Sequence, residues 1–215
     1  MHNMDMMNIH NQEVDFKSSL NNLLEYLEPA AQSVEIHKKT LLHFSNNKIK
    51  YCYILEKGHV AINRVEDGLL LYTESAPFIF GFTMLNRDPY HVILCPSEDS
   101  VLKRLPLAQA MEIIRQESLW KALCHVMAHS LSRLFAHCTR ISQPDIYSTI
   151  RYLLLELSEE VDELRKSESV VNYIQRRSFL SRSGISAVLA ELRRGSYIEM
   201  GNGKLISINQ LPEKF

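Results

Sequence analysis

Hydrophobic positions in the first half of the chain change from a helical period to a strand period. Residues 13–27 place Val14, Leu20 and Leu27 on one side of a helix that Pro29 ends. From about residue 34 the apolar residues instead gather in short runs rich in β-branched and aromatic side chains. These runs lie at 51–55, 60–65, 69–73, 78–82, 90–95 and 101–105. Many short strands at regular spacing predict a β-roll or a sandwich.

Turn residues separate two of these runs. Glu66-Asp67-Gly68 lies between the runs 60–65 and 69–73. Asp-Gly is a strong hairpin signal, because both central residues of such a turn need a positive φ. The sequence therefore predicts an antiparallel hairpin there.

A long amphipathic helix is predicted from about residue 118 to 141, after a shorter helix that Pro106 opens. One stripe recurs at alternating steps of four and three, which is the spacing of a heptad seam: Trp120, Cys124, Met127, Leu131, Leu134, Cys138 and Ile141. A second stripe beside it consists of Leu119, Leu123, Val126 and Phe135. We expect one stripe to pack on the β-domain and the other on the same helix of a second copy. The alternative is a helix buried entirely within one chain.

The C-terminal residues predict three helices followed by a hairpin. Residues 146–166 and 170–177 have helical spacing, and Ser181 is a good N-cap for a further helix that Gly195 ends. The core face of that helix repeats at i, i+3, i+4 and i+7: Ile185, Val188, Leu189 and Leu192. Strand-like runs at 197–200 and 204–208 flank Gly201-Asn202-Gly203. Helix, turn, helix and hairpin in this order predict a winged helix-turn-helix.

Charge points to DNA as the partner of this segment. The whole chain has a net charge of −1, whereas residues 170–205 hold six basic and two acidic side chains, a local balance of +4. The candidate DNA contacts are Arg176, Arg177, Ser181, Arg182, Ser183, Ser186 and Lys204. We expect Arg182 to read a base and Lys204, near the hairpin tip, to contact phosphate. The alternative is a module that contacts another protein.

The sequence gives little indication of metal binding, thiol redox chemistry or catalysis. His125 and His129 lie four residues apart, but no carboxylate completes a metal site. The four cysteines are far apart and are expected to be reduced and mostly buried. Cys138 stands between His137 and Arg140, which makes it the candidate for a thiol redox switch. No catalytic spacing and no glycine-rich phosphate loop is present, so we expect neither an enzyme nor a bound cofactor.

Composition fits a globular, cytoplasmic protein with more than one domain. The chain is 46% hydrophobic and 23% charged, with no secretory signal and no apolar run of the roughly 18 residues that span a bilayer. We expect no membrane partner. All nine histidines precede residue 140, so the two ends differ chemically. The predicted division is an effector β-roll with flanking helices (1–117), a dimerisation helix (118–142) and a winged helix-turn-helix (143–215).

The segment 179–192 resembles the recognition helix of the cyclic-AMP receptor and fumarate–nitrate regulator (Crp/Fnr) superfamily. The resemblance implies an α+β fold with a cyclic-nucleotide-binding-like β-roll, a long dimerisation helix and a C-terminal winged helix. In that family a Ser-Arg pair opens the helix and the Arg reads a base, which here corresponds to Ser181-Arg182. Ser183 and Ala187 replace an acidic residue and an Arg of the family pattern, so the target sequence is expected to differ.

A more specific resemblance covers most of the chain from about residue 30 and is strongest over 170–212. The segments 76–81, 172–174, 195–200 and 203–212 are similar to winged helix-turn-helix regulators of enteric bacteria named for inhibiting hydrogen peroxide resistance (IprA-type). This resemblance implies a role in the oxidative-stress response. Double-stranded DNA and a second copy are the expected partners, with RNA polymerase as a further candidate.

The phosphate cassette of nucleotide-binding relatives is altered. Those members carry Gly-Glu and, about ten residues later, Arg-Ser/Thr-Ala. Here Phe82 follows Gly81, and Tyr90-His91-Val92 occupies the position of the Arg motif. A phosphate without its Arg loses charge-assisted hydrogen bonds, so we expect an apolar, aromatic pocket that does not bind cyclic AMP. Two alternatives stay open: replacement of the cation by Arg87, and a sensor of a non-nucleotide small molecule.

Overall fold

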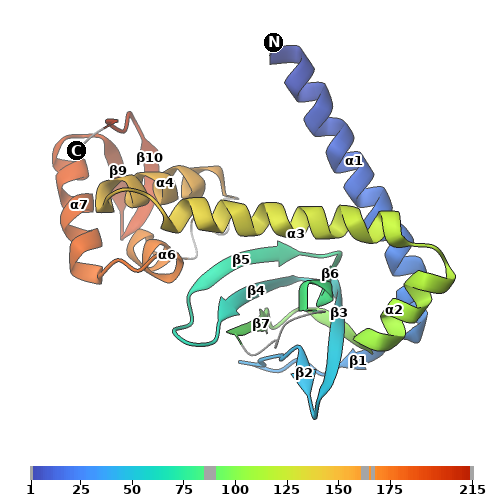
Figure 1. Cartoon of the computed structure of the whole chain (residues 1–215). Helices are drawn as coiled ribbons and strands as arrows, with labels where there is room; N and C mark the ends of the chain where they lie inside the picture. Colours follow the sequence, from blue (N-terminus) through green and yellow to red (C-terminus); the bar gives the residue numbers. More distant parts are fainter. Residues whose placement is uncertain (1, 85–90, 161–164, 166–167, 214–215) are drawn as a thin grey trace. The chain divides into compact units, whose positions relative to one another are not determined.

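The computed structural model describes residues 2–84, 91–160, 165 and 168–213. The chain divides into two compact units, residues 1–134 and 135–215. Helix α3 (Trp120–Ile141) contributes to both units (Figure 1). Each unit is described by itself.

The first unit is a β-roll of two antiparallel sheets, as the strand pattern predicts (Figure 1). One sheet has the order β1-β8-β3-β2, with β6 also paired to β3, and the other has the order β5-β4-β7. The strands are β1 (Gln32–Val34), β2 (Ser45–Asn46), β3 (Ile49–Lys57), β4 (His59–Arg64), β5 (Leu70–Ser75), β6 (Phe78–Phe80), β7 (Val92–Pro96) and β8 (Val101–Pro106). Strands β1 and β2 are too short for the pattern to reveal, and β7 begins at Val92, after the predicted start.

The β4–β5 hairpin is confirmed, and its turn is stabilised by one carboxylate. Asp67 forms an ion pair with Arg64 and accepts a hydrogen bond from the Leu69 backbone N–H at 3.1 Å. Gly68 has a φ of +73°, whereas Asp67 is not among the residues with a positive φ, so the hairpin is confirmed but the expectation of two positive φ values in its turn is wrong.

The helices of the first unit begin at different residues from those predicted. Helix α1 (His2–Leu27) starts well before residue 13, while its buried residues Leu20, Leu23 and Leu27 match the pattern. The short 3₁₀ helices η1 (Glu28–Ala30) and η2 (Phe82–Met84) were not predicted. Pro106 is the last residue of β8 and occupies the N-cap position of α2 (Leu107–Gln116), so the helix itself begins one residue later than predicted.

Helix α3 has one buried face and one exposed face. Leu119, just before α3, and Leu123 and Val126 are buried in the core of the first unit. On the predicted seam, Trp120, Leu131 and Leu134 are 47%, 51% and 43% exposed in the single chain. A helix buried entirely within one chain is therefore ruled out. Phe135, predicted on the same stripe as Leu119, Leu123 and Val126, differs from them because it is 64% exposed.

The second unit is a winged helix-turn-helix, as predicted (Figure 1). It contains α4 (Ile146–Glu159), α6 (Val170–Arg177), α7 (Arg182–Arg194) and the hairpin β9 (Ile198–Gly201) and β10 (Lys204–Ile208). Helix α4 ends earlier than predicted, since Glu160 is extended, and residues 161–164 and 166–167 lie outside the described residues. The fully buried core residues of this unit include Ile150, Leu153, Leu154, Tyr173, Ile174, Ile185 and Leu192.

No helix in the described part of the chain is both long and apolar enough to cross a membrane.

Gly81 is required where the chain leaves β6. Its φ is +112°, and a Cβ built on it would lie 2.7 Å from the Tyr51 carbonyl oxygen and 2.8 Å from Cys52 Cα. Both obstacles are backbone atoms of β3, which cannot rotate away. The glycine of the altered cassette is thus explained by packing against β3.

We expect Gly81→Ala to lower the free energy of unfolding by about 1–3 kcal/mol through backbone strain, with the backbone clash adding to it. Gly68→Ala is the matched control, since Gly68 also has a positive φ but no atom within 4 Å of the new Cβ. Its loss should be smaller, about 1 kcal/mol. Urea unfolding of both variants measures the difference, and equal losses would contradict the proposed close approach.

Candidate nucleic-acid interface

The second helix of the helix-turn-helix is fixed at both ends by the residues that the sequence indicates. The Ser181 hydroxyl accepts a hydrogen bond from the Gly184 backbone N–H at 3.1 Å, which confirms it as the N-cap of α7. Gly195 is the C-cap, and its N–H donates to the Glu191 carbonyl oxygen at 2.9 Å. The left-handed residue after the helix is Ser196, with a φ of 55°.

The two faces of α7 separate core from solvent. Ile185, Leu189 and Leu192 are buried. The predicted contact residues Arg182, Ser183 and Ser186 are exposed. The exposed face thus presents one long cation and two short hydroxyls, which allows close approach to base edges.

Arg182 is held by the preceding helix. Its Nη1 donates to Asn172 Oδ1 at 3.1 Å, and Asn172 lies in the first turn of α6. Sequence patterns do not indicate this contact, because the two residues are ten positions apart in different helices.

The wing is attached to the same turn of α6. The Val170 backbone N–H donates to the Gly203 carbonyl oxygen, in the β9–β10 turn, at 2.9 Å. Lys204 follows this turn and pairs with Gly201 in the hairpin. The first turn of α6 therefore positions both Arg182 and the wing turn.

Arg176 and Arg177 occupy different environments although they are adjacent. Arg176 is exposed and forms an ion pair with Glu168 at 3.3 Å. Arg177 is only 6% exposed, and its guanidinium carbon lies 3.6 Å from the centre of the Tyr173 ring. The prediction that Arg177 contacts DNA is corrected here, because its side chain points into the core.

Arg177 belongs to a buried charge cluster around Glu156. Arg140 Nη2 donates to Glu156 Oε2 at 2.9 Å, the Tyr173 hydroxyl donates to Glu156 Oε1 at 3.0 Å, and Arg177 Nε lies 3.8 Å from Glu156 Oε1. Loss of hydration on burial lowers the pKa of Arg177 and raises that of Tyr173. The cluster joins the end of α3 to α4 and α6.

The residues of the altered cassette line a cavity of about 560 Å³ in the first unit. Gly81, Phe82 and His91 are on its wall, while Tyr90 and Arg87 lie outside the described residues. Sequence reasoning missed the contribution of α3 to this wall, through residues such as Met127 and Leu131. Only the tertiary structure brings α3 to the strands.

The four cysteines differ in burial, and Cys95 is half-buried. Cys52 is buried, and burial raises the pKa of its thiol to about 12. The expectation of mostly buried thiols is wrong for Cys124 and Cys138, which are exposed in the single chain. His137 is buried and Arg140 binds Glu156, so the basic neighbours that made Cys138 the redox candidate are directed elsewhere.

His125 and His129, the candidate metal ligands, each lie close to a polar side chain from another element. His125 Nδ1 is 3.0 Å from the Ser19 hydroxyl, and His129 Nε2 is 3.3 Å from Glu74 Oε1. The described residues contain no group of three or more metal-ligating side chains.

We expect Arg177→Ala to lower the free energy of unfolding by about 2–4 kcal/mol, because it removes a buried cation and its stacking on Tyr173. Arg176→Ala is the control, with a change of about 0.5 kcal/mol or less, since the Arg176 side chain is 53% exposed and its charge stays in contact with water. Thermal and urea unfolding measure both values. Equal stability of the two variants would show that Arg177 is not structural.

Comparison with known proteins agrees with this geometry. A family profile described as winged helix-turn-helix DNA binding matches residues 146–213. The protein called inhibitor of hydrogen peroxide resistance in Escherichia coli K12 is 33% identical over 183 residues, covering 83% of this chain and 86% of that protein. Its namesake in Salmonella typhimurium LT2 is also 33% identical over 183 residues, covering 84% and 87%.

Solved structures share the fold at low identity. The c-di-GMP responsive regulator CLP of Xanthomonas campestris has a TM-score of 0.70 at 14% identity, over 88% of this chain and all of that one. A CRP-family transcriptional regulator of Thermus thermophilus has a TM-score of 0.53 at 20% identity, over 81% and 91%. Both of these solved structures are of regulator proteins, and at this identity they show that the fold is shared. The chain belongs to the inhibitor of hydrogen peroxide resistance family, and it combines a winged helix-turn-helix of the DNA-binding type with the fold seen in Crp/Fnr-type structures.

Proposed function

We propose that this protein is a homodimeric, sequence-specific regulator of transcription that works without cyclic AMP. The observation that carries the proposal is the first turn of α6, which binds Arg182 through Asn172 and the wing turn through Val170. The side chain that we propose to read a base and the wing that we propose to contact phosphate are thereby both held by the first turn of α6.

The proposed DNA contacts separate base reading from phosphate binding. Arg182, at the start of α7, grips a guanine through two hydrogen bonds. Arg176 and Lys204 contact phosphates, which contribute affinity without specificity. The exposed hydroxyls of Ser181, Ser183 and Ser186 add single or water-mediated hydrogen bonds. This face of cations and hydroxyls favours DNA over a protein partner.

The proposed dimer forms through α3. Its exposed apolar side chains Trp120, Leu131 and Leu134 recur at heptad spacing, which supports pairing with the same helix of a second copy. Cys124, Met127, Cys138 and Ile141 complete the seam. A dimer would place two recognition helices about one duplex turn apart, roughly 34 Å, on a palindromic site. The assigned division into 1–117, 118–142 and 143–215 follows these roles.

Independence from cyclic AMP is supported by the replacement of the cassette acid by the buried Phe82. The relatives' name, inhibitor of hydrogen peroxide resistance, supports a regulatory link to oxidative stress. Regulation of transcription places the protein in the cytoplasm with the chromosome, and RNA polymerase is its candidate protein partner.

We expect Arg182→Ala to weaken binding to the specific site by about 1–3 kcal/mol and to relax specificity at one base position. Lys204→Ala should weaken binding to all sequences alike and reduce the slope of log affinity against log salt by about one unit. Arg115→Ala, an exposed Arg of α2, is the control. Binding is measured across a salt series with a duplex selected from fragmented genomic DNA and with its scrambled version. An unchanged ratio between the two duplexes in Arg182→Ala would favour the protein-interaction alternative.

We expect Leu131→Glu to convert the dimer to a monomer, because it places a charge in the apolar seam. Leu41→Glu is the control, since Leu41 is similarly exposed at 56% but does not lie on α3. Light scattering measures the mass of each variant. A dimer that persists in Leu131→Glu would contradict the assignment of the seam.

A further inference from the structure

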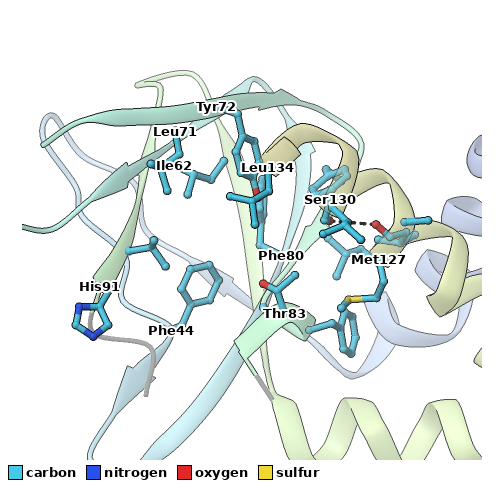
Figure 2. Close-up of a pocket in the computed structure, with 18 residues that line it drawn as sticks. Phe44, Ile62, Leu71, Tyr72, Phe80, Thr83, His91, Met127, Ser130 and Leu134 are labelled. Carbon is cyan, nitrogen blue, oxygen red and sulfur yellow. Dashed lines mark hydrogen bonds between the residues drawn. The ribbon is translucent and has the colours of Figure 1, made fainter. Parts of the chain in front are cut away.

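The cavity of the first unit has walls from both sheets and from α3. Figure 2 shows Ile62, Leu71 and Tyr72 from β4 and β5, facing Met127 and Leu134 from α3. Its volume of about 560 Å³ lies within the range of about 300–1,000 Å³ that is typical of small-molecule sites. It is large enough for a molecule of several rings.

The described wall contains no Lys, Arg, Asp or Glu. Ser130 Oγ already donates to the Val126 carbonyl oxygen at 3.1 Å, so this hydroxyl is engaged within α3 (Figure 2). Burial raises the pKa of Tyr72 to about 12, which keeps its hydroxyl neutral at ordinary pH. Thr83 and His91 are the exposed polar side chains of the wall (Figure 2).

Electrostatics then limits what the cavity can hold. Apart from the exposed imidazole of His91, the described wall offers an anion no basic partner to replace its hydration, and it offers a cation no carboxylate. Apolar surface, by contrast, is stabilised by leaving water. Aromatic walls such as Phe44 and Phe80 favour flat ring systems.

We propose that this cavity binds an uncharged, mainly apolar small molecule with ring character, whose single polar group meets one of the two exposed polar side chains of the described wall, Thr83 or His91. The family's phosphate cassette has thus become a site for a ligand of different chemistry. The residues that carry this change are Phe82, in place of the acid, and the apolar wall around it.

The site also reaches the proposed dimer seam. Met127, Leu131 and Leu134 line the cavity and belong to the seam as well. A ligand that contacts them can bias how α3 pairs with a second copy, and DNA binding changes only to the extent that the ligand binds the DNA-competent dimer more tightly than the other forms of the protein. This regulatory role rests on the proposed function, whereas the ligand site does not require DNA.

Two fluorescent probes with the same carbon frame test the ligand class. N-phenyl-1-naphthylamine is uncharged, and 8-anilinonaphthalene-1-sulfonate adds one sulfonate to it. Titration of the full chain without DNA should show saturable binding of the neutral probe, about tenfold or more tighter than that of the sulfonate. Cyclic AMP should neither bind in calorimetry nor displace the neutral probe. Since no DNA is present, a failure here is distinguishable from a failure of DNA binding.

Substitutions that fill the cavity test its location. Leu71→Trp and Val92→Trp fill it from two different strands, and each should weaken binding of the neutral probe by about tenfold. Val101→Trp is the matched control, because Val101 is exposed on β8 and does not line the cavity, and it should change affinity by about twofold or less. Circular dichroism verifies that each variant is folded, and two filling variants guard against the loss of one. Equal affinity for the two probes, or neutral-probe binding that is unchanged in both folded filling variants, would overturn the proposal.

Discussion

Helix α3 packs one face on the core of the β-roll and leaves another apolar face exposed, and the rest of the structure depends on this division. Its inner side buries Leu123 and Val126 in the core of the β-roll, while Trp120 and Leu131 are exposed. An α-helix can divide its surface in this way because residues three and four apart share a face. The wall of the cavity, the proposed dimer seam and the connection to the DNA-binding unit therefore all involve a single element.

The last turns of α3 are joined to the winged helix by charge rather than by apolar packing. Arg140 binds Glu156, and Glu156 also accepts from Tyr173 and faces Arg177. Buried charges are tolerated only when they are paired and hydrogen-bonded, which makes such a cluster sensitive to geometry. It fixes α6, whose first turn supports the residues that we propose to contact DNA. This cluster of charges and hydrogen bonds therefore supports the helix that carries part of the proposed interface.

The two units use charge in opposite ways. The winged helix displays Arg176 and Arg182 at its surface, where phosphates and bases can be reached. The described wall of the β-roll cavity holds no acidic or strongly basic side chain and is built from aromatic and aliphatic residues. The same fold family can therefore keep its DNA-binding output while the chemistry of its effector site changes, since fold and site are separable.

Sequence alone determined the winged helix and the caps of α7, because local spacing and capping chemistry are readable along one segment. For the first half, strand spacing left a β-roll or a sandwich open, and the resemblance to the Crp/Fnr superfamily favoured the β-roll. Ser181 and Ile185 act as their positions predict. The sequence could not show which of the two adjacent arginines, Arg176 or Arg177, is exposed and which is buried. Successive side chains on a helix point about 100° apart, and the tertiary structure decides which of them meets the core. The Asn172–Arg182 contact, the exposed Phe135 and the α3 wall of the cavity likewise join or separate elements that are distant along the chain. Only packing in three dimensions decides such relations, because they depend on where whole elements come to lie.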